Sequence, residues 1–144
     1  MEKKEIEQKT FMTFHSGFNC AESILKTFVE LYSKKQETNL TKVASGFGGG
    51  IGGSHYETCG ALTGGIIVLG WIFGRNDPCD DKQKVNSLSA EFRNQFLAKF
   101  NSTNCQNLLD IIRNPDSKLD CKKLTAEAAG ILYDILEKEN VSIN

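Results

Sequence analysis

Four of the five cysteines in this 144-residue sequence share one local setting, because each directly follows a residue that commonly caps a helix. These cysteines are Cys20, Cys59, Cys105 and Cys121, and the residues before them are Asn19, Thr58, Asn104 and Asp120. A thiol in the first helical turn lies beside unpaired backbone N–H groups and the positive end of the helix dipole, which lowers its pKa. Thiolates attack disulfides and bind metals. The setting therefore indicates redox or metal chemistry, with convergence of the four helix starts on one site as the hypothesis.

The elements that must position these cysteines are predicted to be helices. Apolar residues at helical spacing indicate helices over about 3–14, 20–32, 40–47, 85–100 and 124–135. Residues 59–73 are apolar on most faces and too long for an average strand, so they predict a central buried helix. We find no persistent alternation of period two. The sequence predicts one all-α domain over residues 1–144, a compact bundle of about five or six helices with a glycine-rich turn before the central helix.

Glycine is concentrated around the second of these cysteines, since 11 of the 13 glycines lie between Gly46 and Gly74. Three of them spell G-x-G-x-x-G, but no hydrophobic strand precedes the run and no acidic residue follows at the required distance, so nucleotide binding is disfavoured. We interpret the run as a flexible turn that carries the chain toward Cys59. Gly60, Ala61 and Gly64 then leave room beside Cys59 for a bulky cofactor or a partner sulfur.

Composition excludes some function classes. The net charge is -1, which provides no basic surface for nucleic acid. The longest apolar stretch, residues 64–73, is much shorter than the ~20 residues that span a bilayer. The charged start of the chain lacks the apolar region of a secretory signal. We therefore expect a cytoplasmic protein without a membrane span, whose partner is a redox protein or a small thiol, with homo-oligomerisation left open.

The cysteine arrangement is specific enough to compare with a family. A first cysteine in Phe18-Asn19-Cys20-Ala21-Glu22, a glycine-rich stretch, Cys59-Gly60-Ala61-Leu62-Thr63-Gly64, and then isolated Cys105 and Cys121 resembles the redox-active family named for its C_GCAxxG_C_C pattern. The resemblance covers about residues 14–136. It implies redox activity that depends on the four cysteines, and it leaves Cys79 outside the pattern.

Several chemistries use four such cysteines, and an iron–sulfur cluster is the one we favour. Four thiolates are the usual ligand set for a [2Fe–2S] or [4Fe–4S] cluster, although intervals of 38, 45 and 15 residues differ from ferredoxin spacing. The first alternative is thiol–disulfide exchange, with Cys59 and Cys20 as the reacting pair. A structural zinc site with four cysteine ligands is a third candidate, weakened by the lack of a C-x₂-C knuckle. Whether the protein is an enzyme is left open.

Two histidines and one further cysteine lie near these positions in the sequence. His15 precedes Cys20 by five residues and His55 precedes Cys59 by four, so either could act as a base or an extra ligand. Solvated surface positions are the commoner outcome for such histidines. Cys79 stands in a polar turn with three aspartates, and we expect it to take no part in the chemistry.

Overall fold

The computed structural model describes residues 1–35 and 39–141, and within them the prediction of an all-α fold is confirmed. The helices are α1 (Lys3–His15), α2 (Cys20–Tyr32), η1 (Thr41–Phe47), α3 (Gly60–Phe73), α4 (Gln83–Phe100), α5 (Cys105–Ile112) and α6 (Cys121–Lys138). Six are α-helices, and η1 is a 3₁₀-helix. Among the described residues no strand forms, and the only ladder contact is an isolated antiparallel bridge between Thr58 and Asn104.

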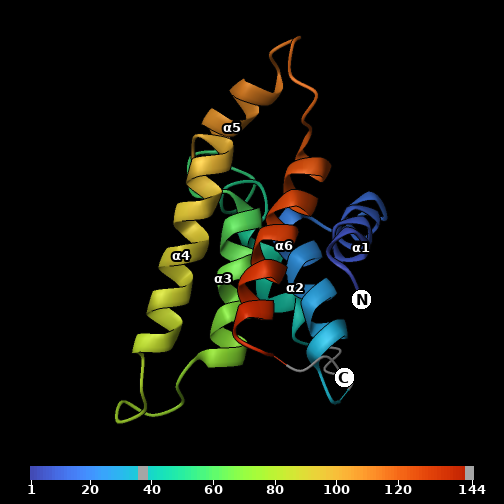
Figure 1. Cartoon of the computed structure of the whole chain (residues 1–144). Helices are drawn as coiled ribbons and strands as arrows, with labels where there is room; N and C mark the ends of the chain where they lie inside the picture. The colour runs from blue at the N-terminus through green and yellow to red at the C-terminus, as the bar shows by residue number, and fades with distance from the viewer. Residues whose placement is uncertain (36–38, 142–144) are drawn as a thin grey trace.

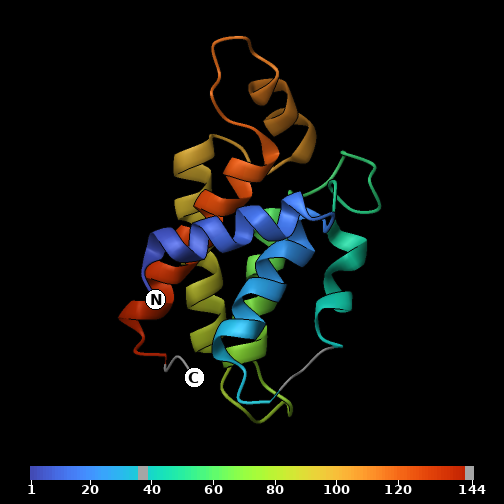
Figure 2. The same ribbon diagram turned by 90° about the vertical axis from the view of Figure 1, so that its right-hand side faces the viewer.

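The helix directions bring several N-termini to one end of the molecule. Helices α2, α3 and α6 run side by side in the same direction, and α4 runs the opposite way along α3 (Figure 1). Helix α5 starts at the end where α2, α3 and α6 begin, and it extends beyond the bundle (Figure 1). Helix α1 crosses α6 and α2 on another side (Figure 2). The four helices that begin at this end are therefore α2, α3, α5 and α6.

Helix α2 follows directly from its sequence pattern. Its apolar stripe is buried, which anchors the helix in the core: Ala21, Ile24, Leu25, Phe28, Val29 and Tyr32. Its first turn is closed by a capping box, in which Asn19 Oδ1 accepts from the backbone N–H of Glu22 at 2.9 Å. The backbone N–H of Asn19 donates in return to Glu22 Oε1 at 3.0 Å. This cap fixes the helix start at Cys20.

Small residues let α3 lie close to the helices on either side of it. A Cβ atom added to Gly64 would lie 2.6 Å from the carbonyl oxygen of Ala21 in α2. A Cβ atom at Gly65 would lie 2.3 Å from Cε2 of Phe92 in α4. Both substitutions would force the helices apart, so these two glycines hold α3 in close contact with α2 and α4.

Two predicted helices differ from the observed ones in detail. The weak pattern over residues 40–47 corresponds to the 3₁₀-helix η1. The central helix begins at Gly60, because Cys59 has a non-helical ψ of 133° and its N–H donates to the carbonyl oxygen of Thr103 at 2.8 Å. Cys59 is thus the N-cap of α3, held by a contact with the α4–α5 connection that a local sequence pattern does not encode.

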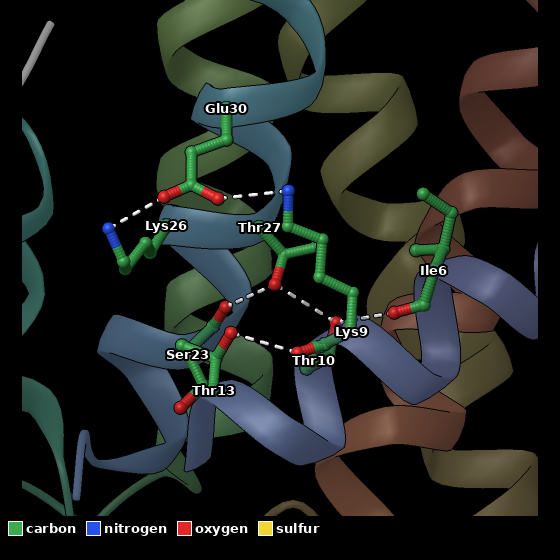
Figure 3. A network of polar contacts seen from close by, with 8 residues as sticks. All are labelled: Ile6, Lys9, Thr10, Thr13, Ser23, Lys26, Thr27 and Glu30. Carbon is green, nitrogen blue, oxygen red and sulfur yellow. Dashed lines mark hydrogen bonds and ion pairs between the residues drawn. The ribbon is translucent and has the colours of Figure 1, made fainter. Parts of the chain in front are cut away.

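A polar network fixes α1 against α2 (Figure 3). The buried hydroxyl oxygens of Thr10 and Thr27 lie 3.3 Å apart, one from each helix. Nearby, the carboxylate of Glu30 accepts from Lys9 Nζ at 2.9 Å and from Lys26 Nζ at 2.6 Å. Because Lys9 belongs to α1 and Glu30 to α2, this ion pair joins the two helices.

A search of the described part of the chain for membrane-spanning helices finds none that is both long enough and apolar enough to cross a bilayer.

Candidate functional site

The four cysteines of the sequence pattern stand at four helix starts. Cys20, Cys105 and Cys121 are the first residues of α2, α5 and α6, and Cys59 is the N-cap residue of α3. All four helix starts lie at the same end of the bundle (Figure 1). All five cysteines of the chain are unpaired thiols.

Three of these helix starts carry a side-chain cap of the kind that the sequence predicts. Asn19, Asn104 and Asp120 each accept a hydrogen bond from the backbone N–H three residues later, at 2.9, 3.0 and 2.8 Å. Thr58 does not cap α3, because the helix begins one residue later than expected and Cys59 takes that position. The caps satisfy part of each first turn and leave other N–H groups near the thiols.

One cavity contains all four sulfur-bearing side chains in its wall. Its volume is about 130 Å³, which is room for several water molecules. Its wall is mostly apolar apart from the cysteines: Phe14, Asn19, Cys20, Gly49, His55, Cys59, Gly60, Cys105, Leu108, Leu109, Ile112, Cys121, Leu124 and Thr125. The structure therefore brings Cys20, Cys59, Cys105 and Cys121 together around a single space.

Cys79 lies apart from this group. It is exposed in the turn between α3 and α4, and its backbone N–H donates to Asp77 Oδ1 at 2.9 Å. It does not belong to the cavity wall. The fifth cysteine thus provides a control position within the same chain.

Backbone contacts tie the Cys59 and Cys105 segments to each other. The N–H of Cys105 donates to the carbonyl oxygen of Glu57 at 2.9 Å, while that of Cys59 donates to Thr103 at 2.8 Å. The Thr58 bridge lies between these two bonds. Glu57 therefore contributes its backbone to the site, and the pairing holds the start of α3 beside the start of α5.

Of the three small residues predicted to make room for a cofactor, the structure places Gly60 in the cavity wall. A Cβ atom at Gly60 would lie 2.3 Å from Cys20 Sγ, so the absence of a side chain there is what admits the sulfur. Ala61 is fully buried in the core, and Gly64 faces the backbone of Ala21. Neither residue is part of the wall, and both serve helix packing.

The prediction that helix starts lower the thiol pKa is wrong for Cys59, Cys105 and Cys121. Burial raises the pKa of Cys59 from 9.0 to about 12, and the nearby Cys20 adds to that rise. Burial followed by the charge of Cys20 also raises the pKa of Cys105 and of Cys121. Desolvation in an apolar wall outweighs the neighbouring N–H groups. These three thiols are therefore protonated at neutral pH, and Cys20 interacts with each of them.

The two histidines occupy different environments. His55 is half-buried and lines the cavity. His15 ends α1 outside the wall, where its Nδ1 lies 3.0 Å from the ammonium of Lys122. Of the two histidines that precede a cysteine in the sequence, His55 therefore lies at the site and His15 lies beside Lys122.

The glycine-rich run is a left-handed loop, a conformation that its sequence interpretation as a turn did not specify. Five successive residues, 49–53, have φ between 62° and 69°, and Ile51 is one of them. A Cβ atom at Gly50 would lie 2.6 Å from Cys105 Cβ, and one at Gly48 would lie 2.4 Å from the side chain of Asn19. The run follows the 3₁₀-helix η1, not the strand that a nucleotide-binding loop requires.

The apolar part of the wall was also missed, although the sequence contains a signal for it. On α5 the lining residues Leu108, Leu109 and Ile112 stand three, four and seven positions after Cys105. This is the spacing of one helical face. Extending each helix face from its first cysteine would have identified these residues.

Within the described ranges, no group of three or more histidine, cysteine, aspartate or glutamate side chains is arranged to hold a single metal ion.

Comparisons with known proteins identify a family. A family model described as "Putative redox-active protein (C_GCAxxG_C_C)" matches residues 18–135. That range includes all four cysteines of the cavity wall. The pattern as printed puts Gly before Cys at its centre, whereas this chain has Cys59 before Gly60. No curated protein and no solved structure matches the chain.

Proposed function

Because the chain belongs to the redox-active family defined by the C_GCAxxG_C_C pattern, we propose that it transfers electrons through an iron–sulfur cluster held by Cys20, Cys59, Cys105 and Cys121. One observation carries the proposal: these four cysteines, from four different helix starts, line one cavity, and Cys79 does not. Four thiolates are the usual ligand set of such clusters. The four thiols surround a cavity and do not converge on one point. This arrangement suits a cluster, which contains more than one iron atom, better than a single metal ion.

The surroundings of the cavity also suit a negatively charged group. The positive ends of four helices lie at this end of the bundle, and their backbone N–H groups can donate to cluster sulfurs. The rest of the wall is largely apolar, with Leu108, Leu124 and Phe14 among its residues. Backbone donors, burial and solvent exclusion are the features by which a protein sets the reduction potential of a cluster.

The protonation state of the thiols favours ligation over nucleophilic attack. The thiolate is the reactive form, and the raised pKa of Cys59 keeps that thiol protonated at neutral pH. A metal ion displaces the thiol proton on binding, so a buried neutral thiol can still become a ligand. The free energy of iron binding thus offsets the free energy needed to ionise these thiols. No base has to deprotonate them beforehand.

Thiol–disulfide exchange is the second candidate, and the position of Cys20 favours it. Cys20 Sγ lies against Gly60, next to Cys59, and Cys20 raises the pKa of the other three thiols. In this chemistry Cys20 and Cys59 form a disulfide and lose two electrons and two protons. A disulfide on a partner protein or a small molecule gains both and becomes two thiols.

Anaerobic purification and reconstitution with ferrous iron and sulfide separate the two candidates. A cluster gives visible sulfur-to-iron charge-transfer bands and stoichiometric iron and acid-labile sulfide. The matched control is Cys79→Ser, which removes the cysteine outside the cavity and retains full iron content. A colourless wild-type protein that binds no iron but exchanges disulfides would replace the cluster with the dithiol mechanism.

A further inference from the structure

Three polar side chains other than cysteine line the cavity, and two of them already have partners within the fold. Asn19 Oδ1 accepts from the backbone N–H of Glu22, and its Nδ2 donates to the carbonyl oxygen of Ser45 at 3.0 Å. Thr125 Oγ1 donates to the carbonyl oxygen of Cys121 at 2.7 Å. The third is His55. Its imidazole makes no hydrogen bond or ion pair to any residue in ranges 1–35 and 39–141.

The backbone of His55 is held by two hydrogen bonds. Its N–H donates to the carbonyl oxygen of Gly49 at 2.8 Å, and its own carbonyl oxygen accepts from Gln106 at 2.9 Å. Its φ of 67° is a conformation that non-glycine residues adopt infrequently and at a cost in free energy. A left-handed loop and the start of α5 thus fix a residue that is among those lining the cavity.

The position of His55 relative to Cys105 is also close. A Cβ atom added to Gly50 would lie 2.6 Å from Cys105 Cβ and 3.1 Å from His55 Cα. The bond from Gln106 to His55 joins the residue after Cys105 to the same loop. The backbone of His55 therefore lies near Cys105. Among the described residues that line the cavity, His55 has the one side chain with nitrogen atoms for which no internal partner is found.

From these contacts we infer that His55 donates a hydrogen bond through its imidazole N–H to a sulfur of the bound cluster, and so raises its reduction potential. The inference rests on the proposed function. A neutral imidazole has one N–H donor, and a donor aimed at sulfur stabilises the more negative, reduced state more than the oxidised state. His55 is a positioning residue in this scheme, because its removal leaves all four thiolate ligands in place.

Two substitutions at position 55 separate the donor from the bulk of the ring. His55→Phe keeps a planar ring and removes the N–H, whereas His55→Gln keeps an N–H donor of similar reach. Both replacements must adopt the left-handed backbone of position 55, so the stability of each variant is measured beside its iron content. His15→Phe is the matched control, since His15 lies outside the cavity wall. Iron content is measured first for every protein, followed by a spectroscopic redox titration of each loaded form.

We expect all four proteins to load iron equally. The reduction equilibrium of His55→Phe should shift about tenfold toward the oxidised state, which is about 59 mV for a one-electron couple. His55→Gln and His15→Phe should stay close to the wild type. The Fe–S stretching bands should also move on deuterium exchange, and they should move less in His55→Phe than in His55→Gln, because backbone donors remain in both proteins.

The outcomes distinguish this inference from the proposed function. A wild-type protein that assembles no cluster overturns the proposed function and the inference with it. A loaded wild type with no deuterium-sensitive Fe–S bands overturns the role of His55 alone. The same holds for a loaded His55→Phe protein whose potential equals that of the wild type.

Discussion

The sulfur of Cys20 lies directly against the first residue of α3, since a Cβ atom at Gly60 would stand only 2.3 Å from Cys20 Sγ. The same Cβ atom would stand 3.0 Å from the carbonyl oxygen of Phe47 and 3.3 Å from the backbone nitrogen of Ala21. Two of these three neighbours are backbone atoms, which cannot rotate away. The start of α2 and the start of α3 therefore approach as closely as they do because position 60 has no side chain.

Gly60→Val tests this contact. The added side chain must displace Cys20 or separate the two helices, and overpacking of this kind costs about 1–3 kcal/mol of unfolding free energy. We expect that loss in urea denaturation, together with reduced iron content after reconstitution. The matched control is Gly70→Ala on the same helix, where an added Cβ atom meets nothing within 4 Å. Gly70→Ala should gain up to about 1 kcal/mol from helix propensity. If Gly60→Val kept the stability and the iron content of the wild type, Cys20 would not be held against position 60 as closely as described.

Removal of the most buried thiol should separate folding from chemistry. Cys59 is 8% exposed, and Cys59→Ala leaves a small cavity that costs about 1 kcal/mol. We expect a helical circular dichroism spectrum like that of the wild type, with bound iron or thiol–disulfide activity lost. Cys79→Ser is the control and should keep both properties. A Cys59→Ala protein with a full cluster and an unchanged redox titration would mean that Cys59 serves packing alone.

Much of the fold could be predicted because its helices are locally encoded. The apolar stripe of residues 20–32 coincides with α2, and the Asn19 cap fixes its start. The start of α3 could not be predicted in the same way. The N–H of Cys59 is held by Thr103, a residue far away in the sequence, and this contact delays the helix by one residue.

The sequence predicts which cysteines line the candidate site, but it predicts neither their pKa values nor the conformation of the glycine-rich loop. The spacing of cysteines after capping residues identifies the four thiols that line the cavity. Sequence alone does not give the burial that raises the pKa of Cys59, because that burial comes from packing between helices. It also does not give the left-handed φ values of Ile51 and His55, which depend on contacts of the loop with α2 and α5.

The stability of the reduced, metal-free protein should fall at alkaline pH. Burial raises the pKa of Cys59 from 9.0 to about 12. Below pH 9 both the folded and the unfolded state keep the proton. Between about 9 and 12 the unfolded state releases it first, so the free energy of unfolding decreases as pH rises. Urea denaturation at several pH values above neutrality measures this slope.

Two controls for the pH experiment remove the ionising group, one with a side chain of similar volume and one with a smaller side chain. Cys59→Val and Cys59→Ala both lack the thiol, and both should lose less stability than the wild type over the same alkaline range. Their slopes should agree with each other, although their stabilities differ through packing. If the free energy of unfolding fell equally with pH in all three proteins, ionisation of Cys59 would not contribute to the pH dependence of stability.

The glycine-rich loop offers a pair of positions that share a backbone conformation and differ in their surroundings. Gly50 has a φ of 67° and Gly52 has a φ of 63°, so alanine is strained at both, by roughly 1–2 kcal/mol. An added Cβ atom at Gly52 meets nothing within 4 Å. At Gly50 it would lie 2.6 Å from Cys105 Cβ and 3.2 Å from the carbonyl oxygen of Glu57.

Gly52→Ala should therefore lose stability through backbone strain alone and still bind iron in full. Gly50→Ala should lose more stability and also lose iron, because Cys105 must move away from the cavity that it lines with the other three cysteines. Iron content per folded protein, measured after reconstitution, separates the displacement of a ligand from general unfolding. Equal iron content in the two variants would mean that the loop does not position Cys105, and that its glycines serve only the left-handed turn.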